Sequence, residues 1–399
     1  MNYQPQASEA IFFMETVLNA SERLAELPLF REVDAALMMQ ILEEAGKFIS
    51  DEIAPLNQTG DSEGAKFSQG QVTMPPGFAA AYQAFWRAGW ASLTADTEDG
   101  GQGLPALLDG VLYEWLSAAN HGWTMAPGLL HGAYECIKHH ASDELKTTYL
   151  SKIGSGEWLA TMCLTEPHAG SDLGRVHTKA HPTTDAQFRI NGTKIFISGG
   201  EHDLTDNIVH LVLARLPEAP PGPKGLSLFL VPKFYNDGTR SAVYCERIEE
   251  KMGIHASPTC VMRFDDALGW MVGEANKGLN AMFIMMNAAR LHVALQGVGL
   301  LDAAWQKANA YAHERRQMRA PKAYGTQNSN SQDHQGPDLI IEHPAIRRVL
   351  DTQRAWIDTS RVLAYETSLA LDIAKHHPDT NQREAANRWC ALVTPVLKS

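Results

Sequence analysis

The sequence has few of the features that mark secreted, membrane-spanning or disulfide-linked proteins. Its five cysteines are scattered and form no CxxC pair, so reduced thiols in a reducing compartment are expected rather than a disulfide framework. The first 22 residues contain no lysine or arginine, which fits neither a secretory leader nor a transit peptide. No run approaches the roughly 18 apolar residues of a membrane span. We therefore expect a cytoplasmic protein without a membrane span.

Positive charge is also in short supply. The sequence contains 34 Lys and Arg residues and 46 Asp and Glu residues, which gives a formal charge of -12. This balance disfavours nonspecific binding to nucleic acid or anionic lipid, so an anionic ligand must find basic residues that cluster locally. The histidine pairs at 139–140 and 376–377 are neighbours along expected helices and point apart, so we expect no metal site.

The periodicity of apolar residues divides the chain into three zones. Residues 1–158 show helical spacing, as in the stripe that follows a helix cap at Asp34, and are expected to be all-helical. Residues 159–275 contain short β-branched and aromatic runs, which predict a small antiparallel β domain with a hairpin at Asn191-Gly192. Residues 276–399 return to helical spacing, with one long helix, a second over 343–376 and a third from about Gln382. A multidomain α+β fold is therefore predicted.

Two segments of the last zone differ from the rest. The stretch "RAPKAYGTQNSNSQDHQGPD" is too polar to pack and is expected to be an exposed loop. The final segment "REAANRWCALVTPVLKS" has an apolar face that continues through Pro395 and needs a partner to bury it. We therefore expect an incomplete C-terminal domain, cut inside its third helix, and a natural protein that extends past Ser399.

The segment "TEPHAGSD" combines hydroxyls, amides and a proline turn at the end of an apolar run. Thr165 would present its hydroxyl and main chain at the mouth of the β domain, and "KIFISGG" would add the Phe196 ring and the Ser198 hydroxyl. Such an edge suits the carbonyls and ring nitrogens of a flavin. From these residues alone, an ordinary turn and strand explain the pattern equally well.

Four segments in order resemble the acyl-CoA dehydrogenase family, particularly its longer bacterial members. They are "MCLTEPHAGSDLG", "INGTKIFISGG", "MGIHASPTCVMRFDDALGWMVGEANKGLNAMF" and "ANAYAHERRQM". The resemblance covers nearly the whole chain and implies an N-terminal helical domain, a central antiparallel β domain and a C-terminal helical bundle, with FAD as cofactor. Members act on fatty acyl-CoA or on thioether-containing acyl-CoA, so chain length and branching stay open.

The resemblance also implies roles for particular residues. Those it places at the flavin are Met162, Leu164, Thr165, Phe196 and Ser198, with Ser198 near N5. Those it places at the acyl-CoA are Ser171, Asn287 and Arg290. Arg315 and Gln317 fall where relatives hold the FAD pyrophosphate of a neighbouring subunit, and His343 matches another FAD contact, which implies a homodimer or homotetramer.

The implied reaction is α,β-dehydrogenation of a saturated acyl-CoA to a trans-2-enoyl-CoA, with electrons passed to an electron-transfer flavoprotein. A carboxylate must remove the α proton, and burial would raise its pKa toward working pH. Ala289 occupies the position that a minority of the family uses for this base, and the majority position lies beyond Ser399. The catalytic residue is therefore unknown, and Glu166 matches a structural turn residue. Two alternatives stay open: an oxidase on the same fold, or a non-catalytic flavin- or CoA-binding fragment.

Overall fold

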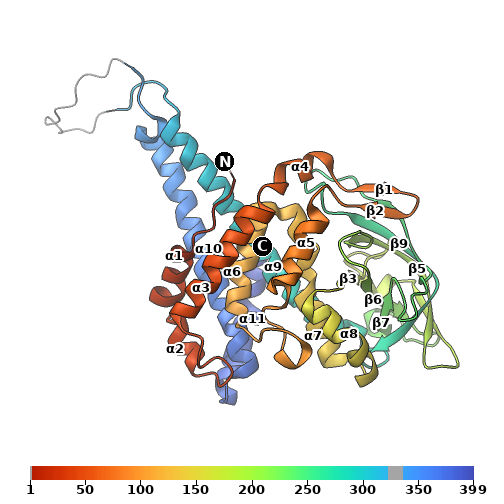
Figure 1. The fold of residues 1–399 in the computed structure, drawn as a ribbon. Helices are drawn as coiled ribbons and strands as arrows, with labels where there is room; N and C mark the ends of the chain where they lie inside the picture. Colours follow the sequence, from red (N-terminus) through yellow and green to blue (C-terminus); the bar gives the residue numbers. More distant parts are fainter. Residues whose placement is uncertain (1, 322–335) are drawn as a thin grey trace.

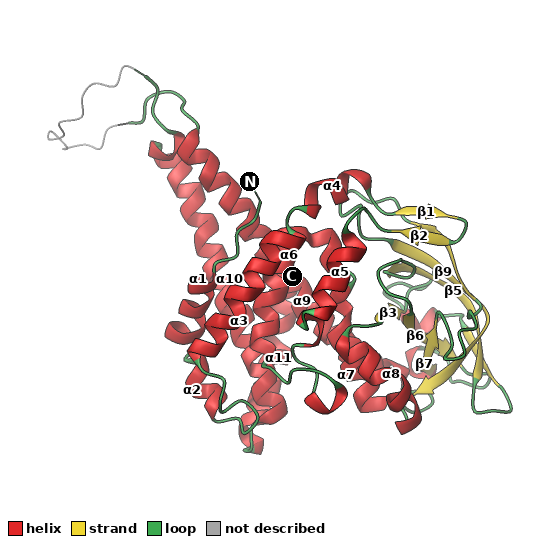
Figure 2. Ribbon diagram, viewed as in Figure 1, coloured by secondary structure: helices red, strands yellow, loops and turns green. Residues whose placement is uncertain are grey.

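Helices fill one side of the molecule and a curled β-sheet fills the other (Figures 1 and 2). A computed structural model describes residues 2–321 and 336–399. Within them, a helical N-terminal region, a central β region and a helical C-terminal region follow one another. The predicted α+β organisation is confirmed. The domain boundaries at 158 and 275 stay predictions.

The N-terminal region contains eight α-helices in the described residues. They are α1 (Ala7–Ile11), α2 (Ala20–Ala25), α3 (Ala35–Phe48), α4 (Leu56–Glu63), α5 (Phe78–Arg87), α6 (Ala106–Thr124), α7 (Leu130–His140) and α8 (Asp143–Ser155). Asp34 caps α3 as expected, because its carboxylate accepts a hydrogen bond from the Leu37 amide at 2.8 Å. Ser142 caps α8 in the same way. The expectation of an all-helical region was wrong at one place, where β1 (Lys66–Ser68) and β2 (Gln71–Thr73) form a hairpin. Its strands are too short for their period to stand out in the sequence.

The central region is a seven-stranded sheet that curls back on itself. Its strands are β3 (Leu159–Cys163), β4 (Lys179–Pro182), β5 (Phe188–Ser198), β6 (Ile208–Arg215), β7 (Leu226–Pro232), β8 (Val243–Ile248) and β9 (Thr259–Val272). Because β6 pairs with β3, β4 and β7, the sheet encloses its own small apolar core. Most pairings are antiparallel as expected, but β3 and β4 both run parallel to β6. Pairings between strands far apart in the chain leave no local signal of their direction.

The hairpin predicted at Asn191-Gly192 is wrong. β5 runs without a break from Phe188 to Ser198, and the pairing with β9 shifts register between Ile190 and Gly192. The Asn191 side chain bonds to Asp266 on β9 instead of closing a turn. A Cβ at Gly192 would lie 2.3 Å from the Thr178 hydroxyl oxygen, so a close approach of chain segments requires this glycine. The pair marks a bulge, which is the other common use of glycine in a strand.

Three long helices form the C-terminal region: α9 (Gly278–Glu314), α10 (Pro344–His376) and α11 (Thr380–Lys398). α9 is apolar and long enough to cross a membrane by length and composition, which the sequence analysis did not flag. It packs instead against α6, α7, α10 and α11 inside the helical layer. Pro395 does not end α11, which continues to Lys398 as the apolar face indicated. A polar loop was predicted over residues 319–338. Residues 322–335 of this segment lie outside the described part of the chain.

A buried ionic cluster joins the N-terminal segment to α6, α9 and α10. The guanidinium of Arg361 donates to the Glu114 carboxylate at 2.5 and 2.9 Å and to Asp302 at 3.1 Å. It also donates to Glu9 at 2.7 Å, while Tyr3 donates to Asp302 at 2.9 Å. Arg361, Glu114 and Asp302 are all buried. Four segments that are distant in sequence therefore share one cation.

We expect Arg361→Met to lower the free energy of unfolding by about 3–5 kcal/mol, because the carboxylates of Glu114 and Asp302 would stay buried without their cation. Arg348→Met is the matched control, since Arg348 is an exposed arginine of the same helix. It should change stability by less than about 0.5 kcal/mol. Urea unfolding of both variants measures the difference, and equal losses would show that the cluster adds no stability.

Candidate functional site

The five residues expected at the flavin lie around the junction of β3 and β5. Met162 belongs to β3, and Leu164 and Thr165 follow the end of that strand. Phe196 and Ser198 lie at the C-terminal end of β5. The Ile195 amide donates to the Thr165 carbonyl at 2.9 Å, which joins the two segments. The structure therefore brings these five residues to one edge of the sheet.

A buried lysine holds this edge in place. Lys194 is fully buried, and its ammonium donates to the Leu164 carbonyl at 3.0 Å and to the Glu166 carboxylate at 2.9 Å. Glu166 also accepts hydrogen bonds from the amides of His177 and Thr178 at 2.7 and 3.0 Å, and from the Thr178 hydroxyl. Lys194 therefore forms hydrogen bonds with the residues on both sides of Thr165. No motif in the sequence indicates this role for Lys194.

The same contacts decide the protonation of Glu166. Burial acts to raise the pKa of its carboxyl group, but Lys194, the Thr178 hydroxyl and the His177 amide outweigh burial and lower the pKa below its usual value. A carboxylate held in this way is a weak proton acceptor. Its structural role agrees with the expectation that Glu166 is not the catalytic base.

The edge offers groups that can hold a flat heterocycle. The hydroxyls of Thr165 and Ser198 make no hydrogen bond to any described residue, and both residues are only partly buried. The Phe196 side chain is 60% exposed, and its φ of 59° lies in the left-handed region that bulky residues rarely adopt. Unused hydroxyls beside an exposed aromatic ring fit the edge and face of a flavin.

The residues expected at a neighbouring subunit's FAD form a second group. Arg315 ends α9, and its carbonyl accepts a hydrogen bond from the Ile340 amide at 2.8 Å. The His343 ring donates to the Gln317 carbonyl at 2.9 Å. This group lies where α9 ends and α10 begins, at the far end of the helical layer from the sheet (Figure 1). The structure therefore keeps it apart from the five residues at the sheet edge.

Two residues expected at the acyl-CoA lie on the wall of a cavity of about 740 Å³ between α6, α7, α9, α10 and α11. Arg290 donates to the Asn287 side chain at 3.0 Å, and both belong to α9. Ser171, the third, is exposed on the loop after β3 and does not line this cavity. The five residues at the sheet edge do not line it either.

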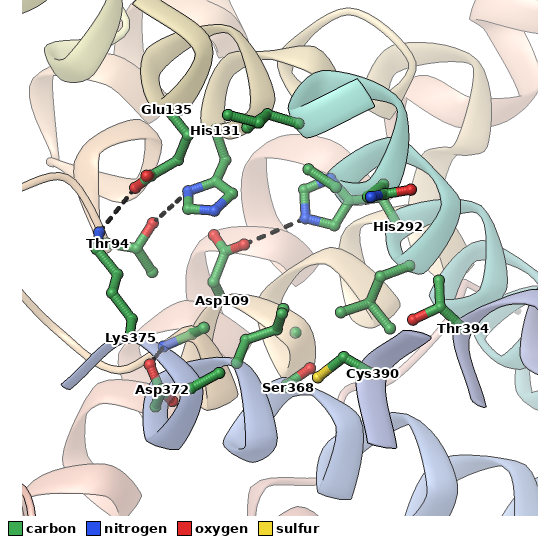
Figure 3. Close-up of a pocket in the computed structure, with 18 of the residues that line it drawn as sticks. Thr94, Asp109, His131, Glu135, His292, Ser368, Asp372, Lys375, Cys390 and Thr394 are labelled. Atoms are coloured by element: carbon green, nitrogen blue, oxygen red, sulfur yellow. Dashed lines mark hydrogen bonds and ion pairs between the residues drawn. The ribbon is translucent and has the colours of Figure 1, made fainter. Parts of the chain in front are cut away.

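Most ionisable side chains of the cavity are paired with one another (Figure 3). Asp109 lies 3.3 Å from the His292 ring, whose other nitrogen donates to the Gly128 carbonyl at 2.9 Å. Burial acts to lower the pKa of His292, but Asp109 outweighs it and raises the pKa. Glu135 pairs with Lys375 at 2.8 Å. The cavity can therefore accept an apolar group without leaving these charges unpaired.

Asp372 of α10 lines the cavity and caps the N-terminal end of α6. Its carboxylate accepts hydrogen bonds from the amides of Ala106 and Leu107 at 2.8 and 3.2 Å. Burial raises its pKa from 3.8 to about 7, against the opposing effect of these amides and of Lys375. Neither Asp372 nor the Asp109 and His292 pair was found from the sequence, because their partners lie more than 180 residues away.

Models of two family domains match this chain. The acyl-CoA dehydrogenase N-terminal domain matches residues 38–157, and the acyl-CoA dehydrogenase middle domain matches residues 161–267. Among curated proteins, the 3-methylmercaptopropionyl-CoA dehydrogenase of Ruegeria pomeroyi is 41% identical over all of this chain and 67% of its own length. A butyryl-CoA dehydrogenase of Syntrophomonas wolfei is 37% identical over 88% of this chain and 59% of its own. The chain thus spans about 60 to 67% of these two relatives.

Solved structures agree on the fold. The butyryl-CoA dehydrogenase of Megasphaera elsdenii superimposes with a TM-score of 0.68 at 22% identity, over 90% of this chain and 85% of its own. The ACDH-11 protein of Caenorhabditis elegans, solved in complex with C11-CoA, has a TM-score of 0.74 at 18% identity and covers all of this chain and 65% of its own.

The fold and these matches define the class, a family of flavin-dependent oxidoreductases. The chain belongs to the acyl-CoA dehydrogenase family, whose cofactor is FAD.

We expect Lys194→Met to lower the free energy of unfolding by about 3 kcal/mol, because Glu166 would stay buried without its cation. It should also weaken FAD binding, since the Leu164 carbonyl would lose the ammonium that positions it. Lys194→Met/Glu166→Gln should recover most of the stability but not the affinity. Urea unfolding and fluorescence titration with FAD measure the two effects.

The control for this pair is Lys251→Met, because Lys251 is a half-buried lysine that donates to the Ser257 carbonyl and has no carboxylate partner among the described residues. It should leave FAD affinity unchanged. If Lys194→Met binds FAD as tightly as the unaltered protein, Lys194 does not position the flavin edge.

The Asp372 carboxyl group should make stability fall as pH rises. The folded protein keeps this proton up to about pH 7, whereas the unfolded chain releases it near pH 3.8, so the folded state binds more protons in between. The slope from this group is at most about 1.4 kcal/mol per pH unit. Asp372→Asn keeps the amide-oxygen cap and should remove this slope. Urea unfolding at pH 5, 6 and 7 gives the comparison, and parallel pH profiles would contradict the assignment.

Proposed function

We propose that this protein oxidises a saturated acyl-CoA to a trans-2-enoyl-CoA with bound FAD. The observation that carries the proposal is the sheet edge at Thr165 and Ser198, which brings an exposed aromatic ring together with two hydroxyls that bond to no described residue. Bound FAD supplies the hydride acceptor for this chemistry. The family membership of the chain supports the same reaction class.

The chain's own residues orient the ring and tune its surroundings. The Thr165 hydroxyl would donate to an acceptor at the edge of the bound ring, and the Ser198 hydroxyl would donate near the atom that accepts hydride. Because Lys194 and Glu166 fix the backbone on both sides of Thr165, these donors need no rearrangement when the ring binds. The exposed Phe196 ring would cover one face of the flavin.

We further propose a short acyl group, since the named relatives act on 3-methylmercaptopropionyl-CoA and butyryl-CoA. Electrons then pass to an electron-transfer flavoprotein. The group at Arg315, Gln317 and His343 lies where α9 ends and α10 begins, apart from the sheet (Figure 1), which supports a homo-oligomer in which two chains hold one FAD.

The test is anaerobic mixing of the FAD-loaded protein with butyryl-CoA or 3-methylmercaptopropionyl-CoA. We expect the flavin absorbance near 450 nm, roughly where oxidised flavins absorb, to bleach as enoyl-CoA forms. Ser198→Ala should slow bleaching about tenfold, the effect of one lost hydrogen bond of about 1.4 kcal/mol. Thr193→Ala is the control, because Thr193 lies on the same strand opposite Arg263.

Bound FAD that bleaches with neither thioester would contradict the proposal and favour the non-catalytic alternative. Hydrogen peroxide formed with turnover in air, without an added acceptor, would favour the oxidase. An unchanged rate in Ser198→Ala would remove that residue from the flavin site.

A further inference from the structure

Five exposed basic side chains gather at the start of β4 and on the neighbouring part of β5. This basic strip consists of Arg175, His177, Lys179, His181 and Arg189. Val176, Thr178 and Ala180 are buried between them, so the side chains at 177, 179 and 181 share the outer face of the sheet. Arg189 joins that face, because it pairs directly with His181 across the strands.

The strip is not neutralised by acidic neighbours. Within the described residues, no carboxylate lies within ion-pair distance of Arg175, Lys179 or Arg189. The carboxylate of Asp266 accepts a hydrogen bond at 2.6 Å from Asn191, the residue opposite Lys179, and forms no ion pair with a described cation. Asp172 instead caps the turn at Gly174.

Arg263 on β9 shows the contrast on the same face of the sheet. It lies opposite Thr193 and is paired with Glu246 at 2.8 Å and with Asp265 at 2.5 Å. In a protein with a formal charge of -12, a stretch of the same sheet that keeps its cations free is suited to an anion.

The strip is rigidly joined to the loop that carries Ser171. The rings of His168 and His177 lie 3.9 Å apart, and His168 donates to the Arg175 carbonyl at 3.1 Å. The Arg215 guanidinium donates to the carbonyls of Gly174 and Val176 at 2.6 and 2.8 Å. The cations of the strip therefore sit on a backbone that is already ordered.

We propose that the basic strip binds the phosphate groups of coenzyme A. This inference rests on the proposed function, because it takes Ser171 as the contact for the thioester arm. From His177 to His181 the strip extends roughly 13 Å along the strand, at about 3.3 Å per residue, so it can contact more than one phosphate. Arginine forks and lysine ammonium groups are the usual partners of phosphate oxygens.

The experiment measures binding without turnover. Calorimetry on the FAD-loaded protein compares coenzyme A, 3′-dephospho-coenzyme A and pantetheine, each at low and high salt. Lys179→Gln/Arg189→Gln should raise the Kd for coenzyme A about tenfold and leave the Kd for pantetheine unchanged. The affinity of this double variant for coenzyme A should also depend less on salt concentration, because fewer protein charges contact the ligand. Arg175→Gln is a second variant on the loop side of the strip and should act in the same direction.

The matched control is Arg31→Gln/Arg87→Gln, which removes the same charge from two exposed arginines outside the sheet. It should bind all three compounds as the unaltered protein does. Equal losses in the control and in the strip variant would mean that only net charge matters, which would overturn the proposal. So would an unaltered protein that binds coenzyme A no better than pantetheine.

A strip variant that loses FAD affinity while keeping coenzyme A affinity would assign these cations to the FAD phosphates and overturn the proposal as stated. A protein that binds coenzyme A through the strip but never reduces its flavin would contradict the dehydrogenase function alone. Far-ultraviolet circular dichroism and the urea midpoint confirm that each variant is folded.

Discussion

The arrangement of the helical layer depends on the buried cation of Arg361. Glu9, Glu114 and Asp302 converge on it from the N-terminal segment, α6 and α9. Apolar contacts among these helices are nondirectional, but a guanidinium has fixed donor positions, so it sets which turns of the helices face each other. The backbones are also close at this level, since a Cβ on Gly299 of α9 would lie 2.3 Å from the Glu114 carbonyl. The charge of Arg361 and the absence of a side chain at Gly299 together define how α6 and α9 cross.

A second buried charge, that of Lys194, holds the sheet edge at Thr165 and Ser198. Lys194 carries its charge into a fully buried site and is balanced by Glu166, which also accepts hydrogen bonds from Thr178 and His177. A buried ion pair of this kind adds little net stability, but it tolerates few alternative geometries. The result is a backbone segment that is held on both sides of Thr165.

Several features could be predicted from the sequence because their signals are local. The Asp34 cap, the long helices and the β-rich middle follow from residue spacing within one or two turns. The hairpin at Asn191-Gly192 failed for the same reason, because that pair signals either a turn or a bulge and only the partner strand decides. Lys194 was overlooked because register shifts in β5 break the alternation that would have marked an inward-facing lysine.

The sequence by itself determined the family, the order of helical and β regions, and the residues gathered at the Thr165 edge, since motifs and periodicity are properties of neighbouring residues. Only the tertiary structure decided the partners of each buried charge. Arg361 meets Glu114 across 247 residues and Lys194 meets Glu166 across 28. It also decided that, within residues 2–321 and 336–399, the cations of the basic strip meet no carboxylate, whereas Arg263 pairs with Glu246 and Asp265. Charge pairing depends on distance in space, and packing sets that distance between segments that the chain order keeps apart.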